Sequence, residues 1–221
     1  MKKSFCWIGT LLLCITLLAG CSASGMKDVQ KSGFLHQYSE LKAGEDDQAA
    51  QVYIKPGLDL KAYDKIVFER VVVMLHDDSG GSAIDPTILK ELADYYQKAL
   101  INAVEGRFQV VDKSGPGVLW VRVAITQVKP SKPVANTVST ILPVGWVVSG
   151  ATKVASDDNM GTGEAASEME VLDSVTGERL AAAIDRRQGG KSAFRGKWDD
   201  TKDAFDYWAK RFRQRLDELD K

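Results

Sequence analysis

Acidic side chains beside a histidine are the first candidates for chemistry. His76 is followed directly by Asp77 and Asp78, and Asp85 comes shortly afterwards. Imidazole nitrogens and carboxylate oxygens bind divalent ions, so this spacing suggests a metal cluster. The intervening residues 79–82 are Ser-Gly-Gly-Ser, which is typical of a plain loop and lacks the alternating oxygen ligands of a calcium site. We therefore expect no metal site here.

A second acidic group suggests the acid and base of a glycan hydrolase. Such enzymes need two carboxylates that face one bond, and this stretch of the chain contains Asp157, Asp158 and Glu164. No pattern in the sequence fixes the separation of these carboxylates, and the neighbouring Gly161 and Gly163 indicate an exposed turn. The hydrolase is therefore an alternative and not the expectation.

Other catalytic signatures are missing from the sequence. It contains two histidines but no G-x-S-x-G elbow, H-E-x-x-H pair or phosphate-binding loop. Its 29 basic residues balance 30 acidic ones, for a formal net charge of −1 at pH 7, which argues against a polybasic nucleic-acid binder. We expect no catalytic residue, no metal, no cofactor and no nucleic-acid partner.

The N-terminus carries an export signal. Two lysines precede an apolar stretch over residues 5–18, which is typical of a secretory signal peptide and short for a membrane span. The stretch ends in L-A-G-C at residues 18–21, which resembles a bacterial lipobox, where the cysteine receives a diacylglycerol before cleavage on its N-terminal side. We expect residues 1–20 to be removed and Cys21 to anchor the chain in the bilayer. A plain signal peptide and an uncleaved membrane anchor are the alternatives.

Cysteine usage agrees with this prediction. Cys6 and Cys14 lie in the segment to be removed, so Cys21 would be the only cysteine of the mature chain, and no disulfide would form within it. In bacterial lipoproteins, aspartate after the acylated cysteine commonly retains the protein in the inner membrane. Ser22 at this position resembles the pattern for export to the outer membrane. We expect a palmitate-bearing lipoprotein of the outer membrane whose body faces the periplasm.

The mature chain divides into a tether and one folded domain. Residues 21–50 lack a sustained hydrophobic period, which predicts a lipidated tether, although Phe34, Leu35 and Tyr38 are apolar enough to dock on the body or on a partner. Docking on the body is preferred, since each large side chain that becomes buried contributes about 1.5–3 kcal/mol. Residues 51–221 are expected to form a single α+β domain.

Hydrophobic periodicity predicts the elements of that domain. Apolar residues recur at helical spacing from Asp85-Pro86 to Gly106, and again from about Asp199 onward, so two amphipathic helices are expected. The expected strands, in chain order, lie at residues 66–75, 108–111, 119–126, 163–171 and 180–184. This order predicts a mostly antiparallel sheet of four to five strands with both helices packed on one face.

The last two strands form a predicted hairpin with one polar face. Glu164, Glu168 and Glu170 alternate with apolar residues, which predicts a half-solvated strand. The arginines that could lie near these glutamates are Arg179, Arg186 and Arg187. Exposed cross-strand pairs contribute only about 0.2–1 kcal/mol, so we interpret the charges as favouring register and solubility.

An uncharged insertion is harder to explain by the fold alone. It covers residues 131–160, and no charged residue occurs at positions 134–152. Pro143 and several polar side chains argue against a membrane-spanning helix. The insertion is either a connection folded over the sheet or a contact surface for a protein partner, a second copy or the membrane. The candidate contact residues are Ile141, Leu142, Val144, Trp146, Val147 and Val148.

Several short motifs carry a family resemblance. They are Ser32-Gly33-Phe34-Leu35 with Tyr38-Ser39, Tyr63-Asp64-Lys65, the turn from Asp173 to Leu180 that continues to Arg187, and Asp203-Ala204-Phe205-Asp206-Tyr207-Trp208. With these motifs the chain resembles, nearly end to end, the bacterial lipoproteins grouped as domain of unknown function 3313. The resemblance implies an envelope location and supplies no catalytic residue.

A non-enzymatic lipoprotein is therefore the main hypothesis. Its periplasmic body would bind another envelope protein or copies of itself, in part through residues 134–152. Two alternatives stay open. One is an envelope hydrolase that acts on glycan or peptide through an acidic pair, and the other is a carrier of a small ligand, which needs an apolar cavity of about 300 Å³ or more.

Overall fold

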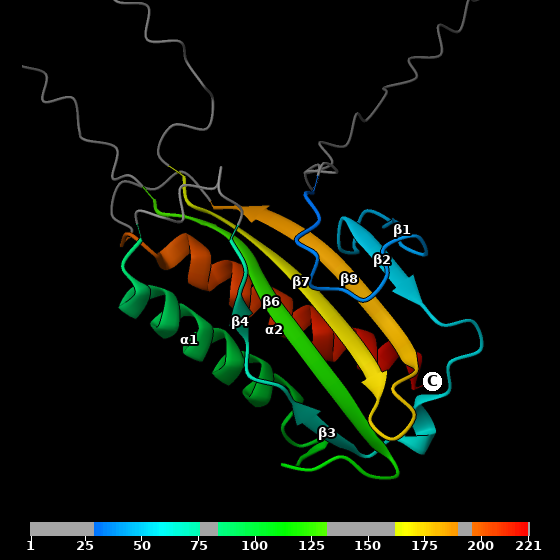
Figure 1. The fold of residues 1–221 in the computed structure, drawn as a ribbon. Coiled ribbons are helices and arrows are strands. Elements are labelled where there is room, and N and C mark those ends of the chain that lie inside the picture. The colour runs from blue at the N-terminus through cyan, green and yellow to red at the C-terminus, as the bar shows by residue number, and fades with distance from the viewer. Residues whose placement is uncertain (1–28, 76–83, 132–161, 190–195, 221) are drawn as a thin grey trace, which may run out of the picture.

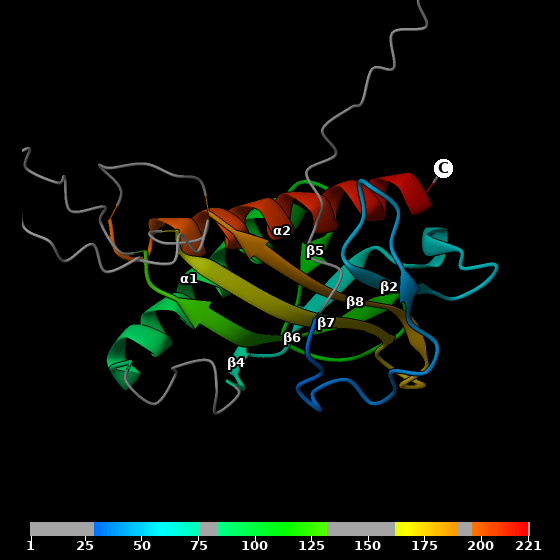
Figure 2. The same cartoon turned by 90° about the horizontal axis from the view of Figure 1, so that it is seen from above.

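A computed structural model describes residues 29–75, 84–131, 162–189 and 196–220. These residues form one eight-stranded sheet with two long helices packed against one face (Figures 1 and 2). The first described residues cross the opposite face of the sheet (Figure 2). The predicted α+β class and the two helices on one face are confirmed.

The order of the strands defines the sheet. The elements along the chain are β1 (Lys42–Ala43), β2 (Gln51–Ile54), the 3₁₀ helix η1 (Leu60–Ala62), β3 (Lys65–Phe68), β4 (Val72–Val73), α1 (Pro86–Val104), β5 (Gln109–Val110), β6 (Val118–Lys129), β7 (Glu164–Asp173), β8 (Arg179–Gln188) and α2 (Asp199–Leu219). Across the sheet the order is β1-β2-β8-β7-β6-β3-β5, and β4 also pairs with β6. Neither helix is long and apolar enough to cross a membrane, as far as the described part of the chain extends.

The sheet is larger and more mixed than the sequence predicted. The expected four to five mostly antiparallel strands were wrong, because the described residues form eight strands and β3, β4 and β5 enter parallel pairings. Helix α1 explains the parallel pairing of β3 with β5. It carries the chain back along the sheet, and a strand reached by such a crossover runs parallel to the one before it. Strands β1 and β2, of two and four residues, are too short for periodicity to reveal.

Helix α1 begins and ends where the sequence predicts. The carboxylate of Asp85 caps the helix and accepts a hydrogen bond from the Thr87 amide at 2.8 Å. Pro86 takes the first helical position, where an N–H would have no partner within the helix. Gly106 follows the helix with a φ of 80°, a conformation that glycine adopts readily. These local signals fix both ends of the helix.

The main core lies between the helices and the inner strands. Tyr96 of α1 stacks on Phe205 of α2 with ring centroids 4.5 Å apart, and both side chains are buried. Strand β6 presents alternate apolar residues to the same core, from Leu119 to Ile125. Aromatic pairs of this kind contribute about 0.5–1.5 kcal/mol beyond the burial of their area. The pair thus joins the two helices into one layer.

The hairpin of β7 and β8 has the turn chemistry that the sequence indicates. Asp173 Oδ1 accepts hydrogen bonds from the amides of Val175 and Thr176, at 2.9 Å and 2.7 Å. The hydrogen bond from the Thr176 amide is the main reason that the pKa of Asp173 lies below its usual value. Gly177 completes the turn with a φ of 71°. The turn sets the register in which β7 faces β8.

Candidate functional site

Strand β7 places two glutamates, Glu168 and Glu170, on the sheet face that lies away from the helices. Both of these side chains, called here the glutamate pair, are 0% exposed, so the predicted half-solvated face was wrong. The reason is residues 29–41, called here the N-terminal segment, which cross this face and exclude water from it (Figure 2). Alternation along β7 had placed the glutamates on one face but could not show what covers it.

Glu168 holds the N-terminal segment through both of its carboxylate oxygens. Oε1 accepts a hydrogen bond from the Ser32 amide at 2.7 Å, and Oε2 accepts one from the Tyr38 hydroxyl at 2.6 Å. The Tyr38 oxygen in turn accepts hydrogen bonds from the amides of Gly33 and Leu35, at 2.8 Å and 3.2 Å. Burial, and then the hydrogen bond to Glu168, raises the pKa of Tyr38. The hydroxyl therefore keeps its proton and remains a donor.

Glu170 lies among cationic and cation-forming side chains. Its Oε2 accepts a hydrogen bond from Arg122 Nη1 at 3.0 Å and lies 2.8 Å from His36 Nδ1. Its Oε1 lies 3.8 Å from Arg179 Nη1 and has no hydrogen-bond donor among the described residues. The side chains of Arg122 and Arg179 are only 17% and 10% exposed. Removal of this carboxylate would leave both guanidinium charges poorly solvated and without their buried partner.

Apolar contacts complete the docking of the N-terminal segment. Leu35 and Val29 are 3% and 8% exposed, and they pack in one cluster with Ala182 and Ile184 of β8. Side chains of this kind contribute about 1.5–3 kcal/mol each when buried. The docking on the body that the sequence favoured is therefore observed. Residues 29–50, which were predicted to belong to the tether, therefore pack on the body, and residues 42–43 form a strand of its sheet.

Of the hydrolase group, the structure describes only Glu164. Glu164 was expected at an exposed turn, but it is 6% exposed and forms ion pairs with Arg186 of β8 and with Lys129 of β6. Its burial follows from its position in β7 between these two neighbouring strands. Asp157 and Asp158 lie outside the described residues.

The predicted arginines serve different partners. Arg179 approaches Glu170 and Arg186 pairs with Glu164, as the sequence suggested for this hairpin. The guanidinium group of Arg187 instead lies over the ring of Tyr207, 3.5 Å from its centroid. The prediction that these charges are exposed was wrong for all three arginines, since each of them is partly buried.

Other predicted positions lie outside the described residues. These positions include the acylation site, Cys21, and the candidate contact residues of the insertion, which are Ile141, Leu142, Val144, Trp146, Val147 and Val148. The same holds for residues 76–78 of the metal cluster that the sequence suggested. Asp85, the fourth member of that cluster, is occupied as the cap of α1.

The glutamate pair was missed as a docking site, although two signals were present. The apolar residues between Ser32 and Tyr38 predicted docking without giving its target. Glu168 and Glu170 alternate on one face, and buried carboxylates need partners that donate hydrogen bonds or carry positive charge. A search for basic residues at matching positions of the neighbouring strands would have found Arg122, which faces Glu170 in the β6–β7 register.

Comparison with known proteins gives a family match and a curated relative. The family model described as "Protein of unknown function (DUF3313)" matches residues 30–212. The match begins inside the N-terminal segment and therefore includes the residues that contact the glutamate pair. The uncharacterized lipoprotein YdcL of Escherichia coli strain K12 is 26% identical over 174 residues, which cover 78% of this chain and 77% of YdcL.

Two solved structures resemble this chain only distantly. The PelC dodecamer from Paraburkholderia phytofirmans is 10% identical, with a TM-score of 0.40, and the match covers 72% of this chain and 96% of PelC. A minor lipoprotein from Acinetobacter baumannii is 8% identical, with a TM-score of 0.31, over 70% of this chain and 92% of that protein.

Proposed function

We propose that this chain, which belongs to the DUF3313 family of proteins of unknown function, is a non-enzymatic lipoprotein of the outer membrane. Its similarity to a lipoprotein of E. coli supports the lipid anchor. Cys21 carries the acyl chains, the body faces the periplasm, and the body binds another envelope protein or copies of itself. The observation that carries this proposal is the docked N-terminal segment.

Docking shortens the connection between the body and the bilayer. An extended chain spans at most about 3.3–3.6 Å per residue. The stretch from Cys21 to Val29 therefore spans at most roughly 30 Å, whereas a tether that ran free as far as Gln51 would span roughly 100 Å. The docked segment keeps the body near the membrane surface. Such a short connection suits a module that meets its partners there.

The pairing of the acidic groups supports binding over hydrolysis. Glu168 accepts hydrogen bonds from the N-terminal segment, and Glu164 is held between Lys129 and Arg186. A general acid or base must reach the proton that it transfers. Buried carboxylates whose oxygens already meet protein partners are poorly placed for that task, so the hydrolase is the weaker candidate.

The contact role of the insertion can be tested in the full chain. Trp146→Asp combined with Val148→Asp introduces two charges into the apolar centre of residues 134–152, and a charge buried in an interface without a partner is strongly unfavourable. Association should fall at least about tenfold, measured by cross-linking in intact cells and by light scattering of the purified protein. Ser149→Asp, at a polar position of the same segment, is the control. Unchanged cross-linked products and an unchanged particle mass would contradict this role.

A further inference from the structure

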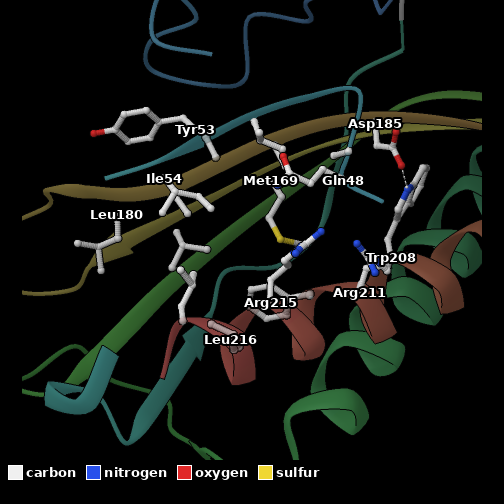
Figure 3. A pocket seen from close by; sticks show the side chains of 18 of the residues that line it. Gln48, Tyr53, Ile54, Met169, Leu180, Asp185, Trp208, Arg211, Arg215 and Leu216 are labelled. Carbon is white, nitrogen blue, oxygen red and sulfur yellow. Dashed lines mark hydrogen bonds between the residues drawn. The ribbon is translucent and has the colours of Figure 1, made fainter. Parts of the chain in front are cut away.

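An apolar cavity of about 150 Å³ lies between α2 and the strands β2, β7 and β8 (Figure 3). Much of its lining comes from Ile54 of β2, Met169 and Val171 of β7, Leu180 of β8 and Leu216 of α2. Protein interiors rarely contain voids larger than a water molecule, and an engineered apolar cavity of about 150 Å³ stays dry and binds benzene. Pockets for whole small molecules start at about 300 Å³. This cavity therefore suits one slender apolar part of a ligand.

Small side chains at the edge of the sheet create this space. Ala181 and Ala183 line the cavity from β8, where larger side chains would fill it. Helix α2 lies against β7 and β8. Helix α1 lies beside α2 and contacts β4, so it is far from the edge of the sheet that β1 and β2 form (Figure 1). The helix layer therefore leaves the outer edge of the sheet incompletely covered.

Two arginines of α2 border the cavity. Figure 3 shows Arg211 and Arg215 projecting from the helix toward the strands. Their Nη2 atoms lie 3.3 Å and 2.9 Å from the same oxygen of Asp47, and Arg215 also pairs with Glu218. Asp47 is 63% exposed, and ion pairs with exposed partners contribute little. Another anion could therefore replace the Asp47 carboxylate on these guanidinium groups.

The acidic side chain in the lining is already engaged. Asp185 Oδ2 accepts a hydrogen bond from Trp208 Nε1 at 2.7 Å, and Oδ1 accepts one from the Ala50 amide at 3.1 Å. Burial raises the pKa of Asp185, and the hydrogen bond from Trp208 acts in the opposite direction. The groups beside the cavity that can attract a new ligand charge are therefore the arginines, and they select an anion.

We propose that the cavity binds the part of one alkyl chain nearest the charged group of an anionic amphiphile, and that this charged group sits on Arg211 and Arg215 in place of Asp47. A free fatty acid and one acyl chain of a phospholipid share this chemistry, because each joins a slender apolar chain to a carboxylate or phosphate. Arginine binds both of these groups through charge-assisted and bidentate hydrogen bonds. The site is separate from the glutamate pair, and this binding goes beyond the proposed partner contact.

The binding test uses the mature chain with Cys21→Ser, which keeps every described residue and lacks the acylation site. Palmitate and lysophosphatidylglycerol, each below its micelle concentration, should displace a fluorescent fatty acid from one saturable site. Tighter binding of palmitate would assign a free fatty acid, and tighter binding of lysophosphatidylglycerol would assign a phospholipid chain. Hexadecanol, which has no charge, should bind about tenfold more weakly. Absence of saturable binding by both anionic probes would overturn the proposal.

Substitutions separate the cavity from nonspecific binding. Ala183→Leu should abolish binding because it fills the cavity, Arg215→Gln should weaken it about tenfold, and Asp47→Asn should strengthen it because a competing carboxylate is lost. The matched control is Arg213→Gln on the same helix, since Arg213 bonds to Asp217 and should leave binding unchanged.

The outcomes decide the proposal even if one variant is unstable. Unchanged binding by folded Ala183→Leu, or equal weakening by Arg213→Gln and Arg215→Gln, would overturn it. If Ala183→Leu does not fold, the opposite effects expected of Arg215→Gln and Asp47→Asn still test the site. Weaker or unchanged binding by Asp47→Asn would then contradict the replacement of that carboxylate by the ligand.

Discussion

Replacing Glu170 with alanine should lower the free energy of unfolding by about 3–5 kcal/mol. Its side chain is 0% exposed and lies between Arg122 and Arg179, which are 17% and 10% exposed. Without the carboxylate, Arg122 and Arg179 keep only their exposed partners, Glu69 and Glu40, and lose the buried charge that compensates them. The segment also loses the contact between His36 and this carboxylate. Urea unfolding followed by circular dichroism measures the change.

A matched control for this substitution shares one of the same arginines. Glu69 accepts a hydrogen bond from Arg122 at 2.9 Å, but its side chain is 46% exposed. Glu69→Ala should therefore lower the free energy of unfolding by less than about 1 kcal/mol. Equal losses for Glu69→Ala and Glu170→Ala would mean that burial of Glu170 does not stabilise this face, and the account of the docking would be wrong.

Leu35→Asp should release the N-terminal segment while the sheet and helices stay folded. Leu35 is 3% exposed and packs against β8, so an aspartate there would be a buried charge with no partner, at a cost of several kcal/mol. The segment can avoid this cost by local undocking, since few other elements depend on it. The Ser32 amide, which donates to Glu168, should exchange its hydrogen about 100- to 1,000-fold faster. Hydrogen–deuterium exchange measures this rate.

The control for release is a charge at an exposed position of the same segment. Gln37 is exposed, so Gln37→Asp should leave the exchange rate of the Ser32 amide nearly unchanged. Two results for Leu35→Asp would count against the account. Slow exchange at Ser32 would show that docking does not depend on Leu35, and fast exchange throughout β6 and β7 would show that the segment cannot be released separately.

Elements bounded by local signals could be predicted from the sequence. The ends of α1 depend on Asp85, Pro86 and Gly106, which act within one helical turn, and the hairpin depends on the turn that follows Asp173. The parallel pairing of β3 with β5 depends instead on how α1 crosses the sheet. Strand β2 pairs with β8 far along the chain, and so short a strand shows no period. No local sequence pattern indicates these strand pairings, because they depend on tertiary structure.

The candidate site could be predicted only in part. The apolar residues near Leu35 indicated docking, and alternation correctly placed Glu168 and Glu170 on one face. The hydrogen bond from the Ser32 amide to Glu168 joins residues 136 positions apart, so periodicity could not reveal it. Glutamate is almost never fully buried unless it is paired, which made exposure the reasonable expectation. Only the tertiary structure supplies the partners that make this burial possible.

The lipid anchor at Cys21 is the central claim, and intact-mass spectrometry of the protein extracted from its native membrane tests it most directly. We predict a chain that begins at Cys21 and carries a diacylglycerol group. Hydrolysis of the ester-linked fatty acids should remove their mass and leave the glycerol thioether on Cys21, and Cys21→Ser should carry none of this added mass. A chain that retains residues 1–20 and carries no fatty acid would contradict both the membrane anchor and the proposed role at the membrane surface.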